Sequence, residues 1–421
     1  MSSAKFQVTA RIFPGQHVRN YPGSTRTKEE DVLYLEAKQY TPLSNQDPQD
    51  GDVTIIATCA SGFPKEMYEP LWDELVEHCQ AQGMRIRAIW CVDKSDHGAS
   101  GVLNEKTQGD DPSFYDHARD ILHMTNVFRE YMPSPLVGIG HSIGATTLIE
   151  LAHIHPRLFS SLVLTDPIVG PEMKALGVVL VHSSNRRPDL WESREEAEKA
   201  FRSAKPLRSW DPRVLDLWLQ HGLRETPTML YPAPGKITLR MSKAHEAWNI
   251  ARPYFDGPPS GSLEHSLIKY PDSIDGMVGS DTFYRPETMS AWTYLPQIRA
   301  SVLYLCPEKG PLRSAKSIEE KVARTGSGAG GSGGEKYGRT SKEILEGAGH
   351  LAPFEKPGEC AKKTAEWLAK DLAAWQERRT FERQNRDDKS INQVGLSEEW
   401  MRRSKEWFDG NMAKPKGKPK L

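Results

Sequence analysis

The chain has 421 residues, 38% of them hydrophobic, which is enough apolar material for one large domain with an insertion. Its 55 basic and 56 acidic side chains give a formal net charge of −1, so no long-range field attracts a polyanion and we do not expect nucleic acid as a partner. The five cysteines are odd in number and lack CxxC spacing, so we expect neither a disulfide framework nor a zinc site. We also expect no other metal and no organic cofactor. Residues 1–13 lack the apolar core of a secretory signal, and no apolar run reaches the roughly 18 residues that a membrane span requires.

The first quarter of the chain predicts the outer and central strands of one sheet. Residues 5–13 and 32–40 alternate apolar and polar side chains on either side of a turn-rich segment, which indicates an antiparallel pair at a sheet edge. Residues 53–60 are continuously apolar, as is typical of a buried central strand, and residues 85–92 predict the next strand. Polar residues follow, including Asp96 and His97, and we interpret them as ordinary loop residues.

One serine lies where a buried strand turns into a helix. Residues 135–140 are a short apolar run, and residues 145–155 place apolar side chains at helical spacing. Ser142 lies between the two segments in a GxSxG pattern, whose glycines leave room for a sharp, strained turn that exposes the serine hydroxyl. The backbone N–H of Ile143 lies at the positive end of the new helix, where it can stabilise an oxyanion. The sequence therefore predicts a nucleophilic serine at position 142.

The regular alternation of strands and helices stops after the next strand. Residues 161–165 predict that strand, which places Asp166 at its carboxyl end. Residues 167–296 contain short helices with clear capping signals and read as a helical insertion. This segment is rich in aromatic residues, which predicts a lid over an apolar pocket, although each aromatic could equally pack the lid onto the body. The aromatics are Trp191, Trp210, Trp218, Tyr231, Trp248, Tyr254 and Phe255.

Strand and helix signals resume in residues 297–375. Residues 300–306 and 342–345 predict the last two strands, and the second is followed by a Gly-rich turn that carries His350. Residues 325–334, TGSGAGGSGG, have no large apolar side chain and predict a flexible loop. Residues 376–421 form a strongly charged C-terminal extension.

A serine hydroxyl is a weak nucleophile unless a base takes its proton and a carboxylate orients that base. Ser142 and His350 fit these roles in chain order, and Asp166 is the preferred acid because it ends the strand next to the serine strand. Glu308, which follows the strand after the insertion, is the alternative acid. In the SGFPKE loop after the third strand, the N–H of Phe63 is the candidate second oxyanion donor, and the alternative is an ordinary turn.

With the motifs GHSIGA and GAGHLAPFEKP, residues 1–375 resemble the lidded α/β-hydrolase superfamily. The resemblance implies an α/β fold, with a mostly parallel eight-stranded sheet, helices on both faces and an inserted helical lid. The core then comprises residues 1–166 and 297–375. The phrases SGFPKEMYEPLWDEL and WDPRVLDLWLQHGLR are similar to fungal hydrolases of host-selective toxin biosynthesis, which implies a peroxisomal enzyme that processes an epoxy-polyenoic acid moiety. Cys59 and Ser61 stand where relatives often have histidine.

We therefore expect a serine hydrolase that cleaves an ester or thioester of a small lipophilic acid, in fungal toxin or other secondary-metabolite biosynthesis. The alternatives are a non-hydrolytic binding protein or isomerase on the same fold, and an epoxide-processing enzyme. The last three residues, Pro-Lys-Leu, are close to the tripeptide that a peroxisomal import receptor reads, so we expect that receptor as a partner and the peroxisome as the location. The alternative location is the cytoplasm.

Overall fold

The computed structural model describes residues 4–172, 177–254, 270–272, 283–310, 315–387 and 395–412. The chain divides into two compact units, Met1–Leu372 and Ala373–Leu421.

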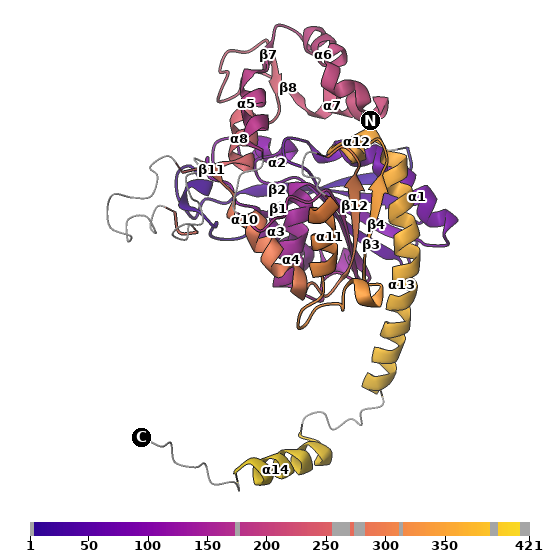
Figure 1. Ribbon diagram of the computed structural model, residues 1–421. Coiled ribbons are helices and arrows are strands. Elements are labelled where there is room, and N and C mark those ends of the chain that lie inside the picture. The colour runs from indigo at the N-terminus through magenta and orange to yellow at the C-terminus, as the bar shows by residue number, and fades with distance from the viewer. Residues whose placement is uncertain are drawn as a thin grey trace, which may run out of the picture. The chain divides into compact units, whose positions relative to one another are not determined.

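The first unit is built around an eight-stranded sheet (Figure 1). In spatial order its strands are β1 (Phe6–Pro14), β2 (Tyr34–Pro42), β4 (Ile86–Val92), β3 (Val53–Thr58), β5 (Leu136–His141), β6 (Ser161–Thr165), β12 (Ser301–Pro307) and β13 (Thr340–Leu345). β2 runs antiparallel to both β1 and β4, and all other neighbours are parallel. The expected antiparallel edge pair and the mostly parallel sheet are confirmed.

Helices cover both faces of this sheet because its central strands are apolar on both sides. Along β4, Ile89 and Cys91 belong to one buried cluster, and Trp90 and Val92 belong to the other. The first cluster includes α1 (Glu69–Ala81) and the beginning of α13 (Pro357–Asp387). The second includes α3 (Phe114–Val127), α4 (Ile143–Ile154), α10 (Pro286–Tyr294) and α11 (Ala315–Arg324).

The segment after β6 forms a separate layer at one end of the sheet. Its elements are α5 (Val178–Arg186), β7 (Leu190–Trp191), α6 (Arg194–Ser203), α7 (Pro212–His221), β8 (Leu223–Glu225), β9 (Ile237–Leu239), α8 (Lys243–Ile250), β10 (Arg252–Pro253) and β11 (Phe283–Tyr284). Figure 1 places this layer beside α2 (Gly98–Leu103) and α12 (Ala352–Glu355), which follow the carboxyl ends of β4 and β13. The insertion therefore lies over the edge where the loops of the parallel strands meet.

The sequence predicts a helical insertion, but the structure also contains strands in this segment. β7, β9 and β8 form a small antiparallel sheet in which Trp191, Ile237 and Leu239 are buried. The strands are only two or three residues long, too short to show an alternating pattern in the sequence.

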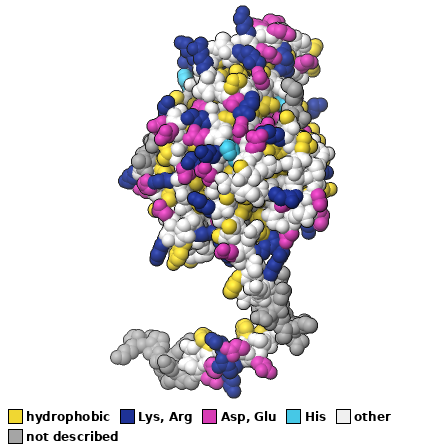
Figure 2. Space-filling view, turned by 90° about the vertical axis from the view of Figure 1, so that its right-hand side faces the viewer, with side chains coloured by type: hydrophobic (Ala, Val, Ile, Leu, Met, Phe, Trp, Pro, Cys, Tyr) yellow, Lys and Arg dark blue, Asp and Glu magenta, His cyan; other side chains and the backbone are white. Residues whose placement is uncertain are grey.

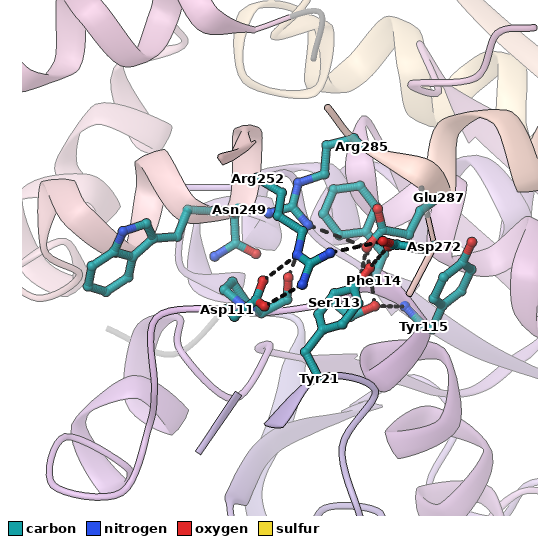
Figure 3. Close-up of polar contacts among 12 residues, drawn as sticks. Tyr21, Asp111, Ser113, Phe114, Tyr115, Asn249, Arg252, Asp272, Arg285 and Glu287 are labelled. Atoms are coloured by element: carbon teal, nitrogen blue, oxygen red, sulfur yellow. Dashed lines mark hydrogen bonds and ion pairs between the residues drawn. The ribbon is translucent and has the colours of Figure 1, made fainter. Parts of the chain in front are cut away.

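Two arginines hold the end of the insertion against the body (Figure 3). The guanidinium of Arg252 pairs with Asp111 at 2.7 Å and with Asp272 at 2.9 Å. Arg285 donates to the carbonyl of Pro112 at 3.0 Å and lies 3.4 Å from the Glu287 carboxylate. Because both arginines are almost fully buried, these charge-assisted bonds fix the insertion to the loop before α3.

The Gly-rich loop 325–334, which the sequence predicts to be flexible, makes defined main-chain contacts with residues 295–298. Its amides at Gly326, Gly328 and Ser332 donate to the carbonyls of Leu295, Pro296 and Ile298, respectively. The absence of side chains allows this close main-chain approach, since a Cβ on Gly331 would lie 2.4 Å from the Pro296 carbonyl oxygen.

The second unit contains α14 (Glu398–Met412), where Arg402 and Arg403 pair with Glu399. The helix exposes Trp400, Met401, Trp407, Phe408 and Met412. No helix in the described part of the chain is long and apolar enough to cross a membrane. On the described surface shown in Figure 2, basic and acidic side chains are interspersed. The terminal Pro-Lys-Leu lies outside the described residues.

Candidate active site

Ser142 lies in a strained turn between β5 and α4. Its φ of 58° and ψ of −122° are unusual for a residue with a side chain. The flanking glycines make the turn possible, because a Cβ on Gly140 would lie 2.6 Å from the Cα of Ala145, and a Cβ on Gly144 would lie 2.6 Å from the carbonyl oxygen of Cys59. The amide of Ser142 also donates to the carbonyl of Thr165 at 2.9 Å, which ties the turn to β6.

A chain of hydrogen bonds joins this serine to a histidine and a carboxylate. His350 Nε2 lies 2.9 Å from Ser142 Oγ, and His350 Nδ1 lies 2.6 Å from Asp166 Oδ2. Because an ionised carboxylate only accepts, Nδ1 carries the proton and Nε2 can accept from the serine hydroxyl. The structure therefore brings together residues that are 208 and 184 positions apart in sequence.

Glu308, the alternative acid, lies elsewhere. Its Oε2 accepts a hydrogen bond from the amide of Gly347 at 2.7 Å, so it braces the turn that precedes His350. Gly310 instead occupies the space beside Asp166, because a Cβ at Gly310 would lie 3.1 Å from Asp166 Oδ2. A carboxylate side chain at position 310 would crowd and repel that of Asp166, so the two positions are alternative sources of one acid.

The two candidate oxyanion donors lie in the expected elements. Ile143 is the first residue of α4, and Phe63 follows Gly62 in the loop after β3. Neither amide donates to a protein acceptor within the described ranges, so both are available to a substrate oxygen. The Phe63 ring packs edge-on against Trp210 and Trp218 of the insertion, with ring centroids 5.8 and 6.0 Å apart.

Comparison with known proteins agrees with this geometry. Residues 59–363 match the model of the alpha/beta hydrolase family. The chain belongs to this family. A type I acyl-CoA thioesterase, mpaH′ from Penicillium brevicompactum, is 38% identical to the chain and is matched over 95% of both proteins. The Alternaria alternata abhydrolase domain-containing protein ACTT2-1 is 30% identical over 57% of this chain and 85% of its own length. Among solved structures, the peroxisomal alpha-beta-hydrolase Lpx1 from Saccharomyces cerevisiae aligns with 99% of this chain over 100% of its own length. The TM-score is 0.67 and the sequence identity is 16%, so the two proteins share a fold.

In this α/β hydrolase, an Asp–His pair binds the loop after β3, which contains the candidate oxyanion donor Phe63. The amide of Gly62 donates to His97 Nε2 at 3.0 Å, so that nitrogen is the acceptor and His97 Nδ1 donates to Asp96 at 2.7 Å. Burial alone would raise the pKa of Asp96, but His97 and Lys94 hold it well below its usual range. The sequence analysis interpreted Asp96 and His97 as loop residues, because nothing local indicates that their partner is a main-chain amide 35 residues away.

A further histidine, His141, binds the main chain of His350. His141 Nε2 donates to the carbonyl of His350 at 2.8 Å, and its Nδ1 accepts from the Tyr68 hydroxyl at 2.8 Å. Tyr68 in turn accepts from the amide of Ala60 at 2.9 Å. Burial, with the nearby His350, lowers the pKa of His141 to about 3, so the ring is neutral. These hydrogen bonds link the ends of β3 and β5 to the loop that contains His350. The sequence analysis did not identify them.

The described aromatics of the insertion divide into three groups. Trp191, Trp210 and Trp218 are buried in the same cluster as the body, so they pack the insertion onto it. Tyr254 is buried in a separate cluster with Tyr270 and Tyr284. Tyr231 and Trp248 instead line a cavity under the insertion, and Phe255 lies outside the described residues. The part of the chain that is described contains no group of three or more His, Cys, Asp or Glu side chains placed to hold a metal ion.

Proposed function

We propose that this α/β hydrolase cleaves an acyl thioester of coenzyme A through an acyl-enzyme on Ser142. The observation that carries the proposal is the hydrogen-bonded chain from Ser142 Oγ through His350 to Asp166. This order of donor and acceptor gives the serine a base and gives the base an orienting carboxylate. Relatives named acyl-CoA thioesterase, similar over 95% of the chain, favour a thioester over an oxygen ester.

The reaction has two halves. Ser142 Oγ attacks the thioester carbon while His350 Nε2 takes the hydroxyl proton, and the amides of Ile143 and Phe63 hold the oxyanion. When the C–S bond breaks, His350 returns the proton to the departing thiolate. Water then attacks the acyl-enzyme while one of its protons goes to His350. As the C–O bond to Ser142 breaks, His350 returns that proton to Ser142 Oγ, and the free carboxylic acid leaves. Asp166 holds the His350 tautomer and stabilises the imidazolium in both halves.

The acyl group is proposed to be a lipophilic acid from fungal secondary metabolism. The named Penicillium and Alternaria relatives support this assignment. We also propose a peroxisomal location through the Pro-Lys-Leu terminus, which is supported by the likeness of that tripeptide to a peroxisomal import signal.

The activity is tested directly by incubating the enzyme with medium- and long-chain acyl-CoA and measuring the release of free thiol. A fluorophosphonate probe tests the serine independently of the substrate: the wild type is expected to be labelled and Ser142→Ala is not. Equal labelling of both proteins, or no labelling of the wild type together with no thiol release, would contradict the proposal.

A further inference from the structure

A cavity of about 250 Å³ lies between the insertion and the body, outside the Ser142–His350–Asp166 chain. The body contributes Arg26, Asp96 and Glu105 to its lining, and the insertion contributes Arg224, Arg240 and His245. The lining thus contains three guanidinium groups, together with the carboxylates of Asp96, Glu105 and Asp189.

The acidic groups of this cavity are already paired. The Glu105 carboxylate pairs with Arg224, and Asp189 pairs with Lys243 at 3.0 Å. Asp96 accepts hydrogen bonds from His97 and the Asn249 amide. Arg26 and Arg240, in contrast, pair with no acidic side chain in the described ranges. The lining contains three carboxylates and three guanidinium groups, and Arg26 and Arg240 are the two guanidinium groups that have no carboxylate partner among the described residues.

Several nitrogens at this cavity also lack an acceptor. Nε of Arg224, Nε of Arg240 and Nε2 of His245 are buried, and none has a hydrogen-bond partner among the described residues. Ser242 Oγ lies 2.8 Å from His245 Nδ1 and accepts from the His245 amide, so its own hydroxyl proton points to Nδ1. Burial lowers the pKa of His245, and the neutral ring then carries its proton on Nε2 as a donor. Leaving buried donors unpaired is costly, so the site suits an anion with several acceptor oxygens.

The cavity is connected to the oxyanion loop through one helix and one loop. α8 lines the cavity through Ala244, His245 and Trp248, and its Glu246 side chain lies beside Gly62, 3.5 Å from where a Cβ would be. From the body side, Asp96 lines the cavity and holds His97, which accepts from Gly62. The cavity and the loop that contains Phe63 are thus neighbours, because both contact α8 and the Asp96–His97 pair.

We propose that this cavity binds phosphate groups of the nucleotide half of an acyl-CoA, with Arg26 and Arg240 as the main ligands and His245 as an additional donor. The inference rests on the proposed thioesterase function and adds the position of the carrier. Guanidinium groups suit phosphate because they offer paired N–H donors in a fixed plane. Coenzyme A carries its phosphates at the end of a long pantetheine arm, away from the thioester carbon. This separation matches a phosphate cavity whose lining does not include Ser142, His350 or Asp166.

Binding can be measured without chemistry in the Ser142→Ala protein by calorimetry with coenzyme A, pantetheine and inorganic phosphate. We expect coenzyme A to bind and pantetheine, which lacks the phosphates, to bind at least 10-fold more weakly. Arg240→Gln and Arg26→Gln, added singly, should each weaken coenzyme A binding by about 10- to 100-fold, the range for a hydrogen bond to a charged group. Arg208→Gln, which removes a positive charge from an exposed part of the insertion, is the matched control.

Binding of inorganic phosphate alone, with coenzyme A no tighter than pantetheine, would overturn the assignment to coenzyme A. Equal coenzyme A affinity in the Arg26, Arg240 and Arg208 variants would overturn it as well. Arg26 is exposed, so its variant tests the site even if the Arg240 variant is unstable.

Kinetics separate this inference from the proposed function. In the active enzyme, the ratio of kcat/KM for acyl-CoA to that for the matching acyl-pantetheine should fall about 10-fold or more in Arg240→Gln and remain constant in Arg208→Gln. Acyl-CoA hydrolysis with an unchanged ratio would leave the thioesterase standing and refute the phosphate site. Arginine-dependent coenzyme A binding without hydrolysis of either thioester would refute the thioesterase and leave the site standing.

Discussion

His350 Nδ1 lies 2.6 Å from Asp166 Oδ2, while Glu308 accepts a hydrogen bond from the Gly347 amide. We therefore expect Asp166→Asn to lower turnover by roughly 10⁴, because the amide loses the charge opposite the imidazolium and disturbs the His350 tautomer. Glu308→Gln keeps an acceptor for Gly347 and should retain turnover within a few-fold. Steady-state rates of the two variants, with thermal unfolding as the control for folding, decide between them. A near-normal rate for Asp166→Asn would overturn the assignment.

Ser142→Ala should lower turnover by roughly 10⁴ to 10⁶ and leave folding intact, because the hydroxyl takes part in chemistry and not in packing. The matched control is Ser61→Ala, since Ser61 Oγ makes only a 3.4 Å contact with His97 and lies outside the hydrogen-bonded chain. Retention of a tenth of the activity in Ser142→Ala would rule out a covalent mechanism.

Ser142 and His350 could be selected as candidates from the sequence because their signals are local. An apolar strand, a GxSxG turn and a helix follow one another directly around Ser142, and His350 lies on a Gly-rich turn after the last strand. The acid could not be decided in the same way. Asp166 and Glu308 both follow strands that end at the same sheet edge, and the choice depends on how each loop turns. The positive φ of 41° at Asp166 is not visible in the sequence.

Other features depend on main-chain contacts that leave no pattern in side chains. His97 accepts from the amide of Gly62, and the Gly-rich loop 325–334 donates to carbonyls of residues 295–298. Composition alone suggested a polar loop in the first case and a flexible one in the second. In both, the partner is a backbone atom far away in sequence, so only the fold identifies it.

His97 is expected to act on turnover by positioning the loop that contains Phe63. His97→Leu leaves the Gly62 amide without its acceptor, and we expect kcat to fall by about 10- to 100-fold with little change in KM, because misplacing one oxyanion donor affects the transition state more than the ground state. His97→Gln, which restores an acceptor, should recover part of kcat. Equal losses in both variants that follow thermal stability alone would show a purely structural role.

His141 should make the stability of the enzyme depend on pH. Its folded-state pKa of about 3 lies below the usual value of 6.5, so the unfolded state binds more protons between these values and stability falls as pH decreases below 6.5. Between pH 7 and pH 4.5 this one group should cost on the order of 2 to 3 kcal/mol. Urea unfolding of wild type and His141→Gln at both pH values measures the difference. An equal loss in both proteins would show that His141 is not its source.

The C-terminal Pro-Lys-Leu should direct the protein to peroxisomes, because import receptors read a terminal tripeptide of this kind. A fluorescent protein that carries only the last dozen residues, expressed in a filamentous fungus with a peroxisomal marker, is expected to give puncta that coincide with the marker. Deleting the final leucine from the fusion is the matched control and should give diffuse fluorescence. Diffuse fluorescence of the intact fusion would show that this tripeptide is not a peroxisomal signal.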